Sequence, residues 1–243
     1  MKHSIGIILL SVSSITPLQA ATLVEVANAE SGDSRVWINE HYARIDLIKP
    51  KDQTATGDEQ PGEMIVDIKA RKLYTVNHKD KVLLEMSDLS IPGQAQPKPK
   101  EVTVKFESQG GGPSIAGYAT QQYLISADGM QCYKALFSRD VLKNKELVNF
   151  YQAMVGATPP QANYANACEA ADAQMDKIPV DTYGIALRVM DLNGKTLYEV
   201  KKIETGVKPP ANYLQLPAGY KIESMAQMLK QLQSQMPPPP PAR

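Results

Sequence analysis

Apolar and polar residues alternate with a period of two over much of the chain. Apolar side chains occupy every second position at Val36/Ile38, Ile45/Leu47, Met64/Val66/Ile68, Tyr74/Val76, Val102/Val104/Phe106 and Tyr183/Ile185/Leu187/Val189. A period of two places these side chains on one face of a β-strand. Charged residues and threonines stand between them, which indicates an antiparallel sheet with one solvated face.

Short polar or proline-rich stretches separate these segments and predict the connections of a meander. They fall at residues 32–33, 52–62, 77–80 and 92–100. Residues 71–86, RKLYTVNHKDKVLLEM, have the pattern of a hairpin. Asn193-Gly194 predicts a second hairpin, which joins the strand at 183–189 to one at 197–204. No clear linker divides the chain, so a single domain over residues 21–221 is expected.

The glycine-rich stretch GGGPSIAGYATQQYLIS, residues 110–126, raises the question of phosphate binding or nucleophilic catalysis. A phosphate-binding P-loop requires G-x-x-x-x-G-K-[ST], and a nucleophile elbow requires G-x-S-x-G between a strand and a helix. Residues 112–117 match neither pattern, and a strand-like segment follows Gly117. The glycines are therefore interpreted as a flexible loop that leads into a strand.

Helical patterns interrupt the strands twice. Apolar residues at helical spacing over 140–155, followed by Thr158-Pro159-Pro160 and a second apolar face, predict a helical hairpin at about 139–176. Near the C-terminus an apolar stripe predicts an amphipathic helix over 222–236. This helix either packs on the sheet or serves as a lid or docking element. Residues 237–243, with five consecutive prolines, predict a disordered extended tail.

The N-terminus and the charge balance indicate an exported protein without a nucleic-acid partner. Residues 1–20 combine Lys2, an apolar run and a cleavage site ending in Ala20, which is the pattern of a signal peptide. The chain has no lipobox cysteine, so a soluble periplasmic protein that is not integral to the membrane is expected. The full chain carries 26 basic and 26 acidic residues, whereas nucleic-acid binding usually requires a clustered basic excess.

The two cysteines, Cys132 and Cys168, predict a disulfide. An even pair in an exported protein is most simply oxidised. A redox C-x-x-C motif and a zinc-ligand spacing are both absent from the sequence. In the chain-entropy model such a crosslink stabilises the fold by roughly 3 to 4 kcal/mol.

The sequence offers no set of catalytic residues, metal ligands or cofactor motif. Outside the predicted signal peptide only His41 and His78 remain, far apart and without metal-binding spacing. Trp37, the sole tryptophan, is either a core residue or the marker of a binding cavity. The protein is accordingly predicted not to be an enzyme.

Three short motifs resemble a known family of exported bacterial proteins. They are Ile115-Ala116-Gly117-Tyr118, the hairpin segment GEMIVDIKARKLYTV and the late segment Leu216 to Lys221. The chain is similar to the family described as domain of unknown function 4412, whose members resemble the lipoprotein carriers LolA and LolB in fold. The resemblance implies a mainly β, α+β fold with a curved antiparallel sheet, or half-barrel, covered by helices. It also implies an apolar interior able to admit acyl chains.

Two hypotheses about function follow. In the first, the protein is a periplasmic carrier that holds a lipid or a lipoprotein acyl chain in the half-barrel. Trp37, Met225, Met228, Leu229 and Leu232 would line or gate this cavity. In the second, the protein is an envelope scaffold with a filled core, and its C-terminal helix binds a protein partner. An unfilled apolar cavity would distinguish the carrier from the scaffold.

Overall fold

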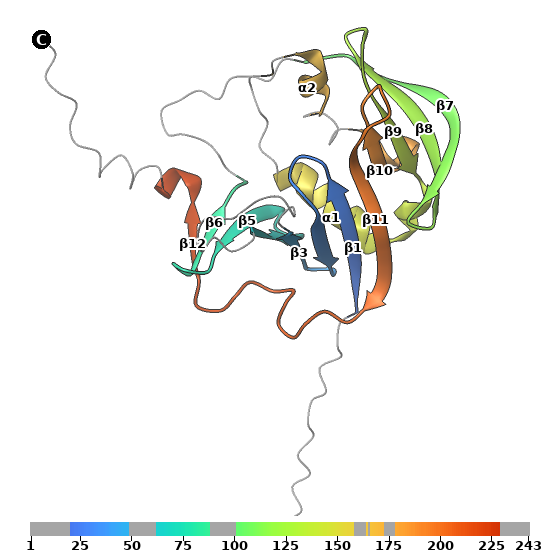
Figure 1. Ribbon diagram of the computed structural model, residues 1–243. Helices are drawn as coiled ribbons and strands as arrows, with labels where there is room; N and C mark the ends of the chain where they lie inside the picture. The colour runs from blue at the N-terminus through green and yellow to red at the C-terminus, as the bar shows by residue number, and fades with distance from the viewer. Residues whose placement is uncertain are drawn as a thin grey trace, which may run out of the picture.

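A single curved β-sheet forms the body of the molecule (Figure 1). The computed structural model describes residues 20–48, 62–87, 101–157, 164, 166–172 and 178–228. Within these ranges the strands form one sheet of 12, in the order β12-β6-β5-β4-β3-β2-β1-β11-β10-β9-β8-β7. They are β1 (Ala21–Asn28), β2 (Ser34–Ile38), β3 (Tyr42–Leu47), β4 (Glu63–Asp67), β5 (Lys72–Asn77), β6 (Val82–Glu85), β7 (Val104–Ile115), β8 (Tyr118–Ala127), β9 (Met130–Ser138), β10 (Ile185–Met190), β11 (Thr196–Val207) and β12 (Lys221–Ser224).

The sheet consists of two meanders that the first strand joins. β1 pairs with its sequence neighbour β2 on one side and with the late strand β11 on the other, both antiparallel. Val24 lies opposite Ile203, and Val26 lies opposite Val200. This pairing makes β1 to β6 and β7 to β11 one continuous sheet. β12 then pairs with β6, and this pair is parallel.

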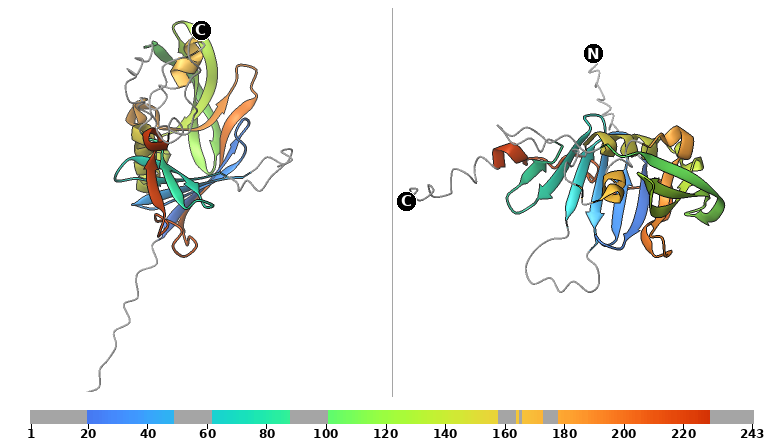
Figure 2. Two further views of the ribbon diagram at one scale, coloured as in Figure 1. Left: turned by 90° about the vertical axis from the view of Figure 1, so that its left-hand side faces the viewer. Right: turned by 90° about the horizontal axis from the view of Figure 1, so that it is seen from above.

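The sheet bends around helix α1 (Lys145–Ala157), as Figures 1 and 2 show. One apolar core contains Val66 of β4, Leu147 of α1 and Leu136 of β9. In a flat sheet β4 and β9 would lie roughly 29 Å apart at about 4.8 Å per strand, which far exceeds a helix diameter of about 10–12 Å. The sheet must therefore curve for one helix to share a core with both halves.

Local sequence explains where α1 begins. A short 3-10 helix, η1 (Asp140–Lys143), precedes it, and Asn144 stands at the junction. The Asn144 Oδ1 atom accepts a hydrogen bond from the Leu147 amide at 3.0 Å, as an N-cap residue does. Leu147, Ala153 and Ala157 are buried against the sheet.

The predicted fold class is confirmed: the described structure is mainly β, with a curved sheet and few helices. Two strands differ from the sequence interpretation. β1 was not predicted, because its run of apolar residues follows directly on the predicted signal peptide and lacks clean alternation. The interpretation of the glycines as a loop was wrong, because Gly110, Gly111 and Gly112 belong to the edge strand β7.

One glycine of this stretch, Gly112, has a steric reason. A Cβ atom on Gly112 would lie 2.3 Å from Leu136 Cδ2 and 2.6 Å from Thr120 Oγ1. β7 therefore approaches its neighbours too closely for a side chain at this position. Ala116 and Gly117 form the turn to β8 with positive φ values of 48° and 86°, as the tight turns of two-residue hairpins require.

The two predicted internal helices exist, but they pack on different strands. α1 packs against β1, β2, β4 and β5, whereas α2 (Ala167–Asp172) packs against β8 and β9. The described parts of the helical hairpin predicted at about 139–176 therefore pack on different strands, whereas residues 158–163 and 173–177 lie outside the described residues. A further short helix, α3 (Val180–Tyr183), precedes β10.

The predicted disulfide is present and fastens α2 to the sheet. Cys132 of β9 and Cys168 of α2 are joined with a Cα–Cα distance of 5.3 Å. A second apolar core lies at this end of the sheet and includes Ile125, Phe137 and Ile178. The rings of Phe106 and Tyr183 stack in it with centroids 4.5 Å apart.

The predicted helix over residues 222–236 begins later than expected. Ile222 and Glu223 lie in β12, and helical residues begin at 225. Ser224 and Gln227 form a capping box: the Ser224 amide donates to Gln227 Oε1 at 2.9 Å, and the Gln227 amide donates to Ser224 Oγ at 3.2 Å. Residues 229–243, which include the predicted tail at 237–243, lie outside the described residues.

Candidate functional site

An apolar cavity of about 250 Å³ lies between α1 and the inner face of the sheet. Its walls come from β1, β2, β3, β10 and β11 on one side and from η1 and α1 on the other. The lining residues are Val24, Val26, Asn28, Ser31, Ser34, Val36, Ile45, Val141, Leu147, Phe150, Tyr151, Ile185, Leu187, Tyr198, Val200 and Ile203. None of these side chains is a carboxylate, lysine, arginine, histidine or cysteine, so the cavity itself offers no general acid or base of these kinds.

Strand alternation produces these walls. Val24 and Val26 are two residues apart on β1 and therefore point to the same face. Val200 lies opposite Val26 on β11 and is buried. The polar residues Asn28, Ser31 and Ser34 stand where β1 turns into β2, and Ser31 is exposed. The cavity therefore reaches solvent at this turn.

Two tyrosines, Tyr151 and Tyr198, line the cavity, and the phenol of Tyr198 has a shifted pKa. Burial raises the pKa of Tyr198 to about 12. The phenol thus stays protonated at neutral pH and acts as a neutral hydrogen-bonding group.

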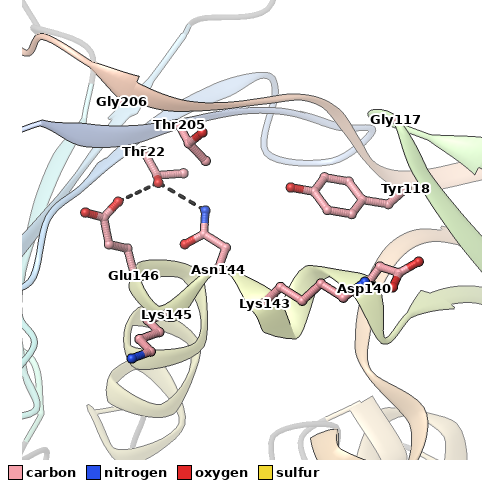
Figure 3. Close-up of a pocket in the computed structure, with 10 residues that line it drawn as sticks. All are labelled: Thr22, Gly117, Tyr118, Asp140, Lys143, Asn144, Lys145, Glu146, Thr205 and Gly206. Carbon is pink, nitrogen blue, oxygen red and sulfur yellow. Dashed lines mark hydrogen bonds and ion pairs between the residues drawn. The ribbon is translucent and has the colours of Figure 1, made fainter.

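A polar pocket of about 570 Å³ lies at the other end of β1 (Figure 3). It is lined by Thr22, Gly117, Tyr118, Asp140, Lys143, Asn144, Lys145, Glu146, Thr205 and Gly206. Thr22 is only 1% exposed. Its hydroxyl donates a hydrogen bond to Glu146 Oε2 at 2.5 Å and accepts one from Asn144 Nδ2 at 3.1 Å. These bonds tie the N-terminal end of α1 to β1.

The charges of the polar pocket are balanced and partly paired. Lys143 Nζ lies 2.6 Å from Asp140 Oδ1. Hydrogen bonding to Asp140 raises the pKa of Lys143, so the lysine is charged at neutral pH. In Figure 3 the hydroxyl of Tyr118 points into the pocket, whereas the Lys145 side chain points away from it.

Trp37 lies outside the apolar cavity. It alternates on β2 with Val36 and Ile38, which are buried in the main core, so it occupies the outer face of the sheet. There its ring packs edge-on against Tyr213, with centroids 6.1 Å apart. Tyr213 belongs to the segment of residues 208–220, which links β11 to β12.

An outer-face cluster of polar residues holds this segment. Arg44 Nη2 lies 2.6 Å from Glu63 Oε2, and Arg44 Nη1 donates to the Tyr213 carbonyl at 3.1 Å. Tyr213 donates its hydroxyl to Asp46 Oδ2. Burial and this hydrogen bond raise the pKa of the Tyr213 phenol. His78 bridges Glu63 Oε2, at 3.1 Å, and the Tyr220 hydroxyl, at 2.8 Å.

The methionines predicted to line the cavity lie elsewhere. Met225 and Met228 are half-buried in the helical residues that follow β12, at the far edge of the sheet from β7. Neither is among the residues lining the apolar cavity. Leu229 and Leu232 lie outside the described residues. Sequence reasoning missed the cavity residues of β1, although the run ATLVEV immediately after the predicted cleavage site is a signal for a buried strand.

Two further searches concern the described ranges only. No group of three or more His, Cys, Asp or Glu side chains in those ranges is placed to hold a metal ion. None of the helices there has both the length and the apolar character needed to cross a bilayer.

The fold is that of a mainly β protein whose curved sheet surrounds helix α1. An apolar cavity lies between the sheet and this helix. Residues 21–220 match the family model described as domain of unknown function (DUF4412), and the chain belongs to this family. No curated protein matches the chain.

Two solved structures are similar in part. The crystal structure of MucB is 11% identical in sequence to this chain, with a TM-score of 0.38. The match covers 84% of this chain and 60% of the MucB chain. The complex of Pseudomonas aeruginosa MucA/MucB shares 11% identity with a TM-score of 0.37, over 85% of this chain and 59% of that chain. This chain thus spans about three fifths of the length of those chains.

Proposed function

We propose that this protein is a non-enzymatic binding protein of the periplasm that holds a hydrophobic ligand, the acyl chain of a lipid or a lipoprotein. The chain would occupy the apolar cavity between α1 and strands β1, β2, β10 and β11. The observation that carries this proposal is the cavity itself, whose buried walls include Val24, Leu187 and Val200. Ligand sites are typically concave and mainly apolar, with a few polar groups.

The size of the cavity indicates how binding would proceed. A volume of about 250 Å³ is slightly below the range of about 300–1,000 Å³ that is common for ligand sites. A bound chain would therefore displace α1 slightly from the sheet. Phe150 and Met154 pack against the core while remaining partly exposed, so this face of the helix is not fully enclosed.

A cavity-filling substitution tests the proposal without adding charge. In Val26→Phe the larger side chain would occupy the cavity, so uptake of dodecanoate should fall by about tenfold or more, equivalent to about 1.4 kcal/mol. The matched control is Val82→Phe, at a half-buried valine on β6 that does not line the cavity. Binding is measured by titration calorimetry, and folding by circular dichroism.

The natural ligand is sought separately, by native mass spectrometry and lipid extraction of the protein purified from its own cells. A stoichiometric lipid would support the proposal. If the wild type takes up neither dodecanoate nor a lipopeptide, the proposal fails and the scaffold hypothesis takes its place. The partner search would then turn to the C-terminal segment predicted as a helix.

A further inference from the structure

The apolar cavity and the polar pocket lie end to end along the same two strands. Val26 pairs with Val200, and Val24 pairs with Ile203, and all four line the apolar cavity. The next residue of β1 on the same face is Thr22, which lines the polar pocket together with Thr205 of β11. Two residues along a strand correspond to roughly 7 Å. The residues of β1 on this face therefore change from apolar to polar over that distance, between Val24 and Thr22.

The residues of η1 and α1 that face the sheet also change from apolar to polar, next to the position of Thr22. Val141 of η1 and Leu147 of α1 line the apolar cavity. Their neighbours Asp140, Lys143 and Glu146 line the polar pocket. The boundary is marked by the bonds of Thr22 to Glu146 and Asn144. The apolar cavity and the polar pocket therefore lie on either side of these hydrogen bonds, and a ligand that reached both would have to open the contact between Thr22 and Glu146.

The polar pocket suits a head group without net charge. It contains two lysines and two carboxylates, and Lys143 is already paired with Asp140 at 2.6 Å. Glu146 accepts the Thr22 hydroxyl. Tyr118 directs its hydroxyl into the open space, and Thr205 is exposed beside it (Figure 3). These two groups offer neutral hydrogen bonds rather than an excess of one charge.

We infer that the ligand is a single-chain amphiphile whose hydrocarbon chain occupies the apolar cavity and whose uncharged or zwitterionic head occupies the polar pocket. This inference rests on the proposed function and specifies the class of its ligand. A single chain is required because the apolar cavity measures about 250 Å³. The Tyr118 and Thr205 hydroxyls would bind the head.

The experiment compares ligands that share one dodecyl chain and differ in the head. Dodecanol, lauroyl lysophosphatidylcholine and an N-lauroyl dipeptide amide are titrated below their critical micelle concentrations. Wild-type protein should bind the two large-headed probes about tenfold more tightly than dodecanol. In Tyr118→Phe/Thr205→Val this advantage should fall by about fourfold or more, because each lost hydrogen bond corresponds to roughly a 2- to 10-fold change in affinity.

Two control variants test whether the effect is specific to the Tyr118 and Thr205 hydroxyls. Tyr123→Phe removes a tyrosine hydroxyl in the aromatic cluster of the second core. Lys195→Ala removes an exposed lysine in the turn between β10 and β11, which lines neither the apolar cavity nor the polar pocket. Both should keep the wild-type ratio between large-headed probes and dodecanol. Dodecanol affinity should be unchanged in all variants.

Each outcome separates this inference from the proposed function. If all three probes bind equally to the wild type, or if the double variant weakens them equally, the polar pocket does not bind the head and the inference is overturned, while the proposed function stands. If no probe binds, both fail. Preference for the lysolipid indicates a lipid source of the head, and preference for the acyl dipeptide indicates a lipopeptide.

Discussion

Arg44 and Glu63 form an ion pair that is largely withdrawn from solvent. Each side chain is 13% exposed, and the atoms that meet are 2.6 Å apart. The Arg44 guanidinium also lies over the Tyr213 ring, 4.2 Å from its centroid. In the described structure Arg44 Nε and Glu63 Oε1 are buried without a hydrogen-bond partner. The pair therefore bears a desolvation cost that its remaining contacts only partly offset.

This balance leads to a prediction at the residue scale. Arg44→Met should lower the free energy of unfolding by about 3 kcal/mol, because it removes the arginine from the largely buried Glu63 carboxylate, which then keeps its contact with His78. Arg44→Met/Glu63→Leu should recover most of that loss. Stability is measured by urea denaturation followed by circular dichroism.

Arg35→Met is the matched control, since its pair with Glu25 is exposed, at 55% and 36% of the two side chains. It should change stability by about 0.5 kcal/mol or less. A double variant as unstable as Arg44→Met alone would contradict the assignment of the cost to the Glu63 carboxylate left without its arginine.

At the scale of elements, the β10–β11 hairpin combines two features. Its turn is specified by the local sequence, and charged side chains of the two strands form ion pairs. The Asn193-Gly194 turn is confirmed: Gly194 has φ 89°, and the Asp191 amide donates to the Lys195 carbonyl at 2.9 Å. Glu199 of β11 lies 2.9 Å from Arg188 of β10 and 3.0 Å from Lys201. Burial by itself would raise the pKa of Glu199, but hydrogen bonds from Arg188 and Lys201 outweigh it and lower the pKa below 4.5.

A carboxylate whose pKa is lower in the folded protein than in the unfolded chain stabilises the fold at pH values above its unfolded pKa. This stabilisation is lost as the pH falls through the folded pKa. Glu199→Gln should therefore cost about 0.5–1 kcal/mol near neutral pH, and the difference from wild type should shrink below about pH 4. Thermal unfolding at several pH values checks this. Glu204 pairs with Lys202, and its side chain is 42% exposed. Glu204→Gln should therefore change the stability less than Glu199→Gln. A Glu199→Gln difference that is constant with pH would contradict the prediction.

At the scale of the whole molecule, the sheet formed by the described residues is open, with its edges at β7 and β12. β12 covers the edge of β6 through a parallel register from Lys221 opposite Val82 to Ser224 opposite Glu85. An uncovered edge strand presents unpaired amide and carbonyl groups to other chains. β12 therefore protects β6 from such pairing.

A truncation tests this role. A chain that ends at Tyr220 lacks β12 and should self-associate through β6, whereas a chain that ends at Met228 keeps β12 and should have the same oligomeric state as the full-length protein. Light scattering coupled to size-exclusion chromatography measures both masses. Equal masses for the two truncated chains, after allowance for their lengths, would show that β12 has no protective role.

Local patterns were sufficient where the physical cause is local. Alternation at Val36/Ile38 and Met64/Val66 identified strands because each side chain is placed by its immediate neighbours on the pleat. The same pattern could not identify β1, whose first four residues are all buried. The start of the C-terminal helix was misplaced because Ile222 pairs with Leu83 of β6, a contact that helical periodicity does not report.

The sequence by itself determined the mainly β class, the Asn193-Gly194 hairpin and the pairing of Cys132 with Cys168, because turn chemistry and cysteine number act locally or leave one choice. Only the tertiary structure decided which residues share a site. Thr22 and Glu146 are 124 positions apart in sequence and meet between the apolar cavity and the polar pocket. Trp37 faces away from the cavity because the register of β2 assigns the inner face to Val36 and Ile38. Such contacts depend on the curvature of the sheet around α1, which arises from packing of both halves on one helix.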